Sequence, residues 1–319
     1  FESLKAVTTG DSNVAIGKSC MASLTSGDAN VAIGTDALGT ATTAEDIIAI
    51  GKGACFHIDN DAADGTIGIG KSALVALTSG ARNLAIGFQA ADALTTSSDN
   101  LAIGYNALTT ATTNVTQNIA IGNYALDAIT AGETVTDNVA LGMNALGALT
   151  TGDRNTALGT NAGITSVDVD KTVLIGYNAG AGGNMTSDAD GTIAIGEHAG
   201  YALTSGQANT VIGFQALFAE DDGDKSTAVG YKALTAQTGT SGTVGNTAIG
   251  FEAGSNITTG IENTIVGAFS TISAVGGQNQ IVIGNGITGE GDNKAVIGNT
   301  SITDVYMAKD SGATVHCAG

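Results

Sequence analysis

The sequence has no proline and no tryptophan, and aromatic side chains make up only 4% of its 319 residues. Proline lacks a backbone N–H and interrupts sheet ladders, so its absence suits a chain whose amides are nearly all committed to such hydrogen bonds. No apolar run approaches the length of a membrane span, and no secretion signal is visible. We therefore expect either export through assembly into a particle or a processed or truncated product.

Basic side chains are also scarce. The chain has 11 Lys and Arg against 30 Asp and Glu, which gives a net charge of −19. Nucleic acids and anionic membranes attract clustered Lys and Arg, so this balance opposes both as partners. The negative charge favours a rod that stays in solution outside a cell.

Cysteine is rare, and Cys20, Cys55 and Cys317 form no closely spaced metal motif. Cys20 and Cys55 lie two repeats apart, which is about 10 Å along a solenoid at the usual strand spacing. This separation is too large for a disulfide. We expect both to be buried thiols that pack as small hydrophobic side chains.

The most prominent feature of the sequence is one repeated phrase. Residues 100–108 read Asn-Leu-Ala-Ile-Gly-Tyr-Asn-Ala-Leu. Their glycine recurs along the chain, mostly every 17 residues, at Gly17, Gly34, Gly51, Gly70, Gly87, Gly104, Gly122, Gly142, Gly159, Gly176, Gly196, Gly213, Gly230, Gly250, Gly267, Gly284 and Gly298. Such a period, sustained from end to end, indicates one elongated solenoid. Coils about 4.8 Å apart would make a rod of roughly 80 Å.

The residues before each glycine predict a short strand with two apolar faces. The positions one and three before the glycine are mostly branched and apolar, and they share a face because strand side chains alternate. The position between them is mostly alanine, at Ala15, Ala32, Ala85, Ala102, Ala120, Ala140 and Ala248. Strands that are apolar on both faces are buried on both. We expect the large aliphatic face to fill the coil interior and the alanine face to lie against another copy of the chain.

An asparagine recurs four residues before the glycine, at Asn13, Asn30, Asn83, Asn100, Asn118, Asn138, Asn155, Asn209, Asn246 and Asn263. Stacked coils would align these amides into a ladder in which each donates to the next, as in cross-β assemblies. Alternatively, these asparagines form a row that binds a ligand. After the glycine, Ala-Leu pairs are expected to form the second wall of the coil. Where Gly163, Gly180, Gly200 or Gly254 replaces the leucine, we expect a thinner or bent coil.

Some repeats carry extra residues, which lie before Gly70, Gly122, Gly142, Gly196 and Gly250. Insertions in repeat proteins map to loops on one face, often the face that meets a partner. After the last repeat, Ile302, Val305 and Met307 suggest a terminal hairpin or cap. We therefore divide the chain into 1–12, the end of a preceding repeat, 13–300, the solenoid, and 301–319, a C-terminal cap.

The Asn-Val-Ala-Ile-Gly-x-x-Ala-Leu repeats resemble the β-roll heads of trimeric autotransporter adhesins. The longer coils, with turns such as Leu-Thr-Thr-Gly at residues 149–152, look more like bacteriophage tail-fibre proteins. The resemblance covers residues 1–300. It implies an all-β, left-handed parallel β-roll or β-solenoid of about 17 coils, assembled as an intertwined or side-by-side homotrimer. The segment that begins at Gly298 is similar to the stretch that precedes a self-cleaving chaperone in phage fibres. The adhesin alternative requires this chain to be a fragment.

Enzymes with related folds are poorer matches. Left-handed β-helical acyltransferases have three hexapeptides per coil and a histidine base, whereas this chain matches one hexapeptide per coil. His57, His198 and His316 have no neighbouring acid or nucleophile in the repeat alignment. A Thr-rich ice-binding solenoid is another alternative, but the Thr-Thr pairs fall in turns. We expect no enzymatic activity, with a polysaccharide-degrading fibre as the alternative, because paired carboxylates also serve glycosidases.

Two sets of side chains are candidates for ligand contact. Aromatic residues that directly follow a repeat glycine either cover the coil corner or offer sugar rings an apolar surface, and they are Phe88, Tyr105, Tyr177, Phe214, Tyr231 and Phe251. The last three are expected to stack. Loop carboxylates either are solvated or supply oxygen ligands to Ca²⁺, and they are Asp59, Asp61, Asp64, Asp188, Asp190, Asp221, Asp222 and Asp224.

The sequence thus favours a structural, adhesive, extracellular fibre of a phage virion, which presents a contact to a host-cell glycan or protein. The head of a bacterial surface adhesin is the alternative. We expect no catalytic residue, and no cofactor other than a possible Ca²⁺. The alanine column and asparagines such as Asn13, Asn30 and Asn100 are expected to hold the trimer and the coils together. An aspartate at Ile103 is expected to unfold the local coils, because a buried unpaired carboxylate has no compensation.

Overall fold

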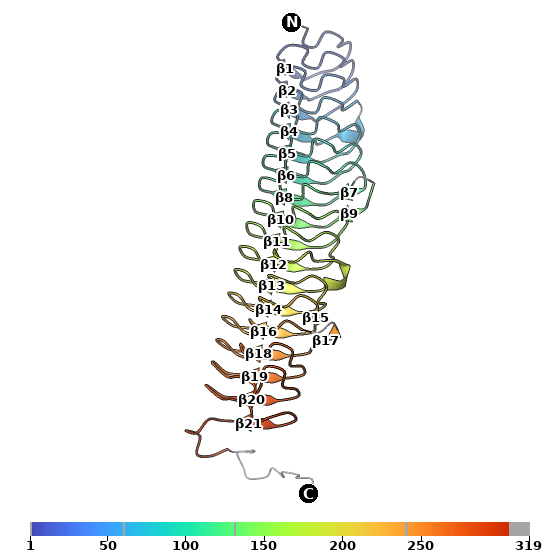
Figure 1. Ribbon diagram of the computed structural model, residues 1–319. Helices are drawn as coiled ribbons and strands as arrows, with labels where there is room; N and C mark the ends of the chain where they lie inside the picture. Colours follow the sequence, from blue (N-terminus) through green and yellow to red (C-terminus); the bar gives the residue numbers. More distant parts are fainter. Residues whose placement is uncertain (1, 60, 131, 240–241, 306–319) are drawn as a thin grey trace, which may run out of the picture.

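The protein is a β-solenoid shaped as a long, slightly bent rod (Figure 1). A computed structural model describes residues 2–59, 61–130, 132–239 and 242–305, apart from the side chain of Asp61. Its main sheet has 17 parallel strands, so consecutive strands are joined by about 16 turns of the coil. The prediction of an all-β parallel solenoid is confirmed. The proposed C-terminal cap, with Met307, His316 and Cys317, falls mostly outside the described residues.

Each repeat contributes one three-residue strand to the main sheet. In chain order these are β1 (Val14–Ile16), β2 (Val31–Ile33), β3 (Ile48–Ile50), β4 (Ile67–Ile69), β5 (Leu84–Ile86), β6 (Leu101–Ile103), β8 (Ile119–Ile121), β10 (Val139–Leu141), β11 (Thr156–Leu158), β12 (Val173–Ile175), β13 (Ile193–Ile195), β14 (Thr210–Ile212), β16 (Thr227–Val229), β18 (Thr247–Ile249), β19 (Thr264–Val266), β20 (Ile281–Ile283) and β21 (Ala295–Ile297). Equivalent positions pair without slippage, as in Leu101 with Ile119 and Ala102 with Ala120. The register therefore follows the repeat, and each side chain stands in a column of its equivalents.

The longer repeats carry short extra elements. These are the 3₁₀ turns η1 (Asp61–Ala63) and η2 (Ser187–Ala189), the pair β7 (Val115–Thr116) with β9 (Val135–Thr136), and the pair β15 (Gly223–Asp224) with β17 (Gly242–Thr243). All four lie on the side of the rod away from the main-sheet labels (Figure 1). The insertions therefore widen the rod on one side and leave the main sheet regular.

The prediction of which strand face points inward is wrong. Ala32, Ala85 and Ala102 are at most 1% exposed within a single chain, whereas Ile16 is 59% exposed. The alanine side chains therefore fill the coil interior, and the large aliphatic side chains point out of the sheet. Ala15, in the first coil, is partly buried against the same core. The alanine column, Ala15, Ala32, Ala85, Ala102, Ala120, Ala140 and Ala248, is unable to form the interface between chains that the sequence suggested.

The reason lies on the opposite wall of the coil. The Ala-Leu pairs after each corner are fully buried, as in Ala107 and Leu108, and a further aliphatic residue such as Leu94 or Leu149 is buried below them. These side chains occupy the narrow interior and leave room for only a small side chain at the strand centre. Because interiors are close-packed, the bulk comes from the turns and the strands contribute mainly methyl groups.

The four coils with glycine in place of the wall leucine are not thinner or bent there. Leucine at this position has a left-handed backbone, for example a φ of 57° at Leu108, and Gly163 has a φ of 61°. A neighbour fills the vacated space, because a Cβ on Gly163 would lie 2.7 Å from Leu174 Cδ1. A larger residue at the centre of a strand, such as Leu174, thus fills the volume that a glycine in the wall, such as Gly163, leaves open.

The predicted asparagine ladder is confirmed in its main stretches. Nδ2 of Asn155 donates to Oδ1 of Asn138 at 3.0 Å, and Nδ2 of Asn138 donates to Oδ1 of Asn118 at 3.1 Å. Each amide also closes its own coil, as where Asn138 Nδ2 donates to the carbonyl oxygen of Gly152 at 2.9 Å. Asn13, Asn30 and Asn100 belong to the same column. The ladder is interrupted where other residues take the place of asparagine, namely Ile47, Thr66, Thr172, Thr192, Ser226, Gln280 and Lys294.

We predict that Asn138→Ala lowers the free energy of unfolding by about 3 kcal/mol, since it leaves buried backbone and amide groups without partners. Asn138→Thr should lower the free energy of unfolding by a smaller amount. At Thr172 a threonine already donates its hydroxyl to Oδ1 of Asn155 at 2.7 Å and replaces part of the ladder. Urea titration monitored by circular dichroism measures both variants, and equal losses would contradict the role given to the amide.

Candidate functional site

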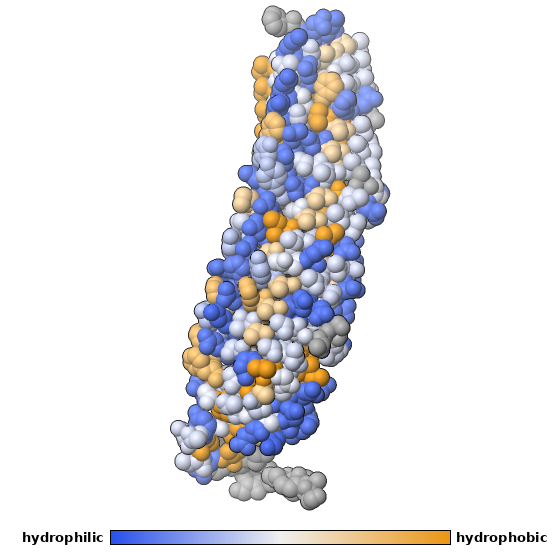
Figure 2. Space-filling model, viewed as in Figure 1, coloured by the Kyte–Doolittle hydropathy of each residue, from blue (hydrophilic) through white to orange (hydrophobic). Residues whose placement is uncertain are grey.

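The most extensive candidate site is the outward face of the main sheet. We call it the aliphatic stripe: the Val, Ile, Leu and Thr side chains at the first and third position of each main-sheet strand, Ala295 replacing the aliphatic in β21. Large members that are at least 36% exposed are Val14, Ile16, Ile33, Leu141, Leu158, Ile212, Ile249, Val266, Ile281, Ile283 and Ile297. Figure 2 shows apolar side chains at the surface, including a run along one edge near the N-terminal end. The stripe side chains from β3 to β8 are half-buried, and the more exposed members lie nearer both ends. Apolar side chains exposed along a sheet of this length mark an interaction surface.

A row of residues borders the stripe along one edge. We call it the ridge: the residues that directly follow the corner glycines, including Lys18, Phe88 and Tyr231. As predicted, the rings of Phe214, Tyr231 and Phe251 stack, with centroids 5.2 and 4.8 Å apart and planes within 10° of parallel. Phe269 extends this group at 5.0 Å, although the sequence did not single it out.

The stacking limits what the aromatic rings offer to a ligand. Phe88 stacks on Tyr105 at 5.3 Å, and Lys71 Nζ lies 5.2 Å from the centre of the Phe88 ring. Tyr177 contacts the ring of His198 edge-on at 5.6 Å. Because stacked ring faces cover one another, the stacked members expose mainly their edges, whereas sugars stack on faces. A sugar platform is therefore restricted to the ends of each stack, and the covering of the coil corner is the better supported reading.

The predicted calcium ligands separate into different places. Asp188, Asp222 and Asp224 line one open pocket of about 270 Å³ together with Ser205, Gln207 and Gly242. Asp221 lies next to this group, since Glu220, Asp221 and Asp222 have ligand oxygens within 4.8 Å of one another. Several oxygens are already used by the protein.

The remaining carboxylates lie elsewhere or have other roles. Asp190 Oδ1 accepts from the backbone N–H of Asp170 at 2.7 Å, and Asp59 Oδ1 accepts from the Thr42 hydroxyl at 3.1 Å. Asp64 lies with Asp59 in a different coil from the Asp222 group, and the side chain of Asp61 is outside the described part. Asp190 and Asp59 thus join neighbouring coils, and Ca²⁺ binding stays a prediction.

Glu220 precedes Asp221 and Asp222 in the sequence but is not a solvated loop charge. Its side chain is fully buried in the coil interior. Its carboxylate accepts from Gln237 Nε2 at 2.6 Å and from the backbone N–H of Gly223 at 2.8 Å. Gln237 also donates to Ser226 Oγ at 3.0 Å and accepts from Asn246 Nδ2 at 2.9 Å. A closed polar network thus replaces one apolar layer of the core.

Burial raises the pKa of Glu220 above its ordinary value of 4.5, although the hydrogen bonds from Gln237 and Gly223 oppose the shift. A carboxyl group with a raised folded-state pKa binds more protons in the folded than in the unfolded state. The free energy of unfolding should therefore fall as the pH rises from about 4.5 towards the folded-state pKa. We predict that replacing both Glu220 and Gln237 with Leu makes the free energy of unfolding less dependent on pH. Thermal unfolding measured between pH 4 and 8 tests this. The same pH dependence in the variant and the wild type would contradict the role given to Glu220.

The described histidines and cysteines do not assemble a catalytic centre. His198 Nε2 lies 3.2 Å from Asn178 Nδ2, and its Nδ1 lies 3.5 Å from the carboxylate of Glu197, with no nucleophile beside them. His57 contacts the ring of Phe56. Cys20 and Cys55 are free and buried, as predicted, and burial raises the pKa of the Cys55 thiol to about 12. Such a thiol is a poor nucleophile.

No protein-family model matches this chain, and a search of the curated proteins finds no match. Among the described residues, no helix has the length and apolar character needed to cross a membrane. The geometry of the chain itself is therefore what supports a function.

Proposed function

We propose that this chain is a structural and adhesive subunit of an extracellular fibre, a homotrimeric phage tail fibre that presents a contact to a host-cell glycan or protein. The observation that carries the proposal is the aliphatic stripe. A single chain leaves apolar side chains exposed along its main sheet, at 42% for Leu141 and for Ile249. Association of copies removes this surface from water at about 25 cal/mol per Å² of apolar area.

The trimer proposed here uses a different face from the one expected from the sequence. The alanine column is already enclosed by its own coil, so the copies are proposed to meet through the aliphatic stripe. A flat sheet packs face to face against another at a distance of about 10 Å. The main sheet extends from Val14 to Ile297, so the contact would run along most of the rod.

The mass in solution tests this interface. At micromolar concentration we expect three chain masses in analytical ultracentrifugation for the wild type. The double variant Ile212→Glu with Ile249→Glu should sediment as a folded monomer, because both side chains lie at exposed stripe positions. Thr134→Glu, at an exposed position directly before β9, is the matched control and should stay trimeric. A well-folded monomeric wild type would remove the proposal.

The receptor contact is proposed to lie on the side that carries η1, η2 and the two short strand pairs. This side is shaped by the insertions and lies away from the main-sheet labels in Figure 1. Incubation with capsule or lipopolysaccharide tests adhesion against the polysaccharide-degrading alternative. We expect retention of the fibre on the polysaccharide without release of oligosaccharide.

A further inference from the structure

The two edges of the aliphatic stripe differ in charge. On one edge lies the ridge, which in the first four coils holds Lys18, Thr35, Lys52 and Lys71. On the other edge lies what we call the shoulder, the two residues just before the buried asparagine column. In the first four coils the shoulder is acidic, and its residues are Asp11, Ser12, Asp28, Ala29, Glu45, Asp46, Asp64 and Gly65. The N-terminal part of the stripe therefore has a positive and a negative edge.

Ridge and shoulder residues of one coil are too far apart to pair with each other. Asp11 and Lys18 are seven residues apart, and Asp46 and Lys52 are six, with a strand between them. At about 3.3 Å per residue this is on the order of 20 Å. All four side chains are exposed, and no ion pair within 4.0 Å involves Lys18 or Lys52 among the described residues. These lysines are therefore available to a second chain.

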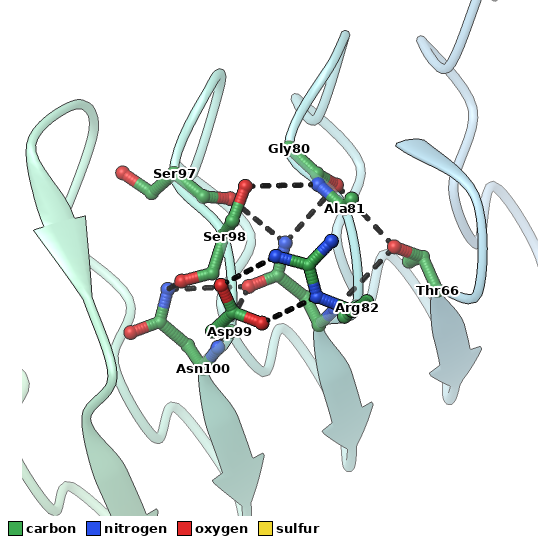
Figure 3. Close-up of polar contacts among 9 residues, drawn as sticks. Thr66, Gly80, Ala81, Arg82, Ser97, Ser98, Asp99 and Asn100 are labelled. Carbon is green, nitrogen blue, oxygen red and sulfur yellow. Dashed lines mark hydrogen bonds and ion pairs between the residues drawn. The ribbon is translucent and has the colours of Figure 1, made fainter. Parts of the chain in front are cut away.

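Lower in the rod the pattern changes. The shoulder there carries the cations, at Arg82, Arg154, Lys171 and Lys225. Figure 3 shows one of them, Arg82, whose Nε donates to the Asp99 carboxylate at 2.6 Å in the next coil. In the coils of Lys171 and Lys225 the ridge residues are Tyr177 and Tyr231, which carry no charge. In none of the 17 repeats do ridge and shoulder both carry a cation, whereas the repeat of Gly196 has an acid on both, Glu197 and Asp190. The charge argument therefore rests on the first four coils.

The relative orientation of two copies decides which edges meet. When two sheets face each other through a rotation about the rod axis, the ridge of one meets the shoulder of the other at the same height. In an antiparallel arrangement ridge would meet ridge, and Lys18 would lie near the C-terminal coils of its partner. The parallel arrangement without axial shift brings all three lysines of the first coils to carboxylates. A shift of one coil would either move Lys71 to Arg82 or move Lys18 beyond Asp11.

We propose that a second copy docks on the aliphatic stripe parallel and level, with Lys18 and Lys52 paired to the partner's Asp11 and the partner's Asp46. This inference rests on the proposed function, since it assumes that copies associate through the stripe. The apolar side chains supply the affinity. The charged edges set orientation and axial position, because complementary charges mainly confer specificity.

Charge swapping tests the pairing. The ridge variant Lys18→Glu with Lys52→Glu and the shoulder variant Asp11→Lys with Asp46→Lys should each weaken association at least tenfold in 20 mM salt. The variant with all four changes should return to within about threefold of the wild type. An equimolar mixture of the ridge and shoulder variants should associate more tightly than either alone. All positions are exposed, so circular dichroism should show unchanged folding.

A cross-link gives an independent measurement. Lys18→Cys with Asp11→Cys, in a Cys317→Ser background, should form disulfide-linked dimers and trimers under mild oxidation, whereas either cysteine alone should not. A wild type that is monomeric removes the proposed function and this inference together. A trimeric wild type whose four-change variant stays as weak as the single-edge variants, or whose cross-link fails, removes only the parallel and level pairing.

Discussion

Replacing Ala102 with aspartate should unfold the middle of the rod, with a loss of roughly 4 kcal/mol or more in the free energy of unfolding. Ala102 is 1% exposed and lies in the column between Ala85 and Ala120. A carboxylate there would have no cation and only methyl groups beside it on the adjacent strands. Urea unfolding and the yield of soluble protein measure the effect.

The neighbouring change Ile103→Asp is the matched control. The sequence suggested that this variant would unfold the local coils, but Ile103 lies on the outward face and is only partly buried. We now expect a folded chain whose association is weakened. If Ile103→Asp unfolds the protein and Ala102→Asp does not, the structure has the faces the wrong way round.

A second large effect is expected at the corner that follows this strand. Gly104 has a φ of +143°, and a Cβ there would lie 2.5 Å from the carbonyl oxygen of Gly122 in the next coil. Gly104→Ala should therefore cost about 4 kcal/mol, through backbone strain and a clash that no side-chain rotation relieves. Thermal unfolding monitored by circular dichroism checks the loss.

Gly53 provides the comparison for this glycine. It also has a positive φ, at +65°, but a Cβ there would meet nothing within 4 Å. Gly53→Ala should cost only about 1 kcal/mol, which is the penalty of a left-handed backbone for an L-residue. Similar losses at both positions would show that strain alone, without the close approach of the coils, explains the corner glycines.

The repeat was sufficient to predict the sheet. Each of the 17 corner glycines follows a main-sheet strand, and the stacking of equivalent positions produced the asparagine ladder and the Phe214–Tyr231–Phe251 stack. Periodicity determines register when every coil repeats the last. It says nothing about how copies of the chain meet, because a single sequence contains no partner.

The strand faces were misassigned because side-chain size was taken as the guide to burial. The asparagines held the better signal. Asn100 and Ala102 are two residues apart, so they point to the same side of the strand. An amide ladder that closes its own coil has to lie inside, which places the alanine inside with it. Side-chain size misled because the turn residues, such as Leu108, already fill the interior.

The buried network around Glu220 was missed for a related reason. Acidic neighbours suggested a solvated loop, whereas the repeat alignment places Glu220 seven residues after Gly213, as Leu203 is seven after Gly196. Both are fully buried. Position in the repeat was therefore a better guide to burial than the charge of adjacent residues.

The stacking direction of the strands has a mechanical consequence. The hydrogen bonds of the main sheet run along the rod, so a pull on its two ends loads successive coils in series, and the weakest coil yields first. A lone solenoid would open like a spring at that point. Neighbouring rods packed along its length would carry the tension in shear across many coils at once, which suits a filament that has to withstand traction.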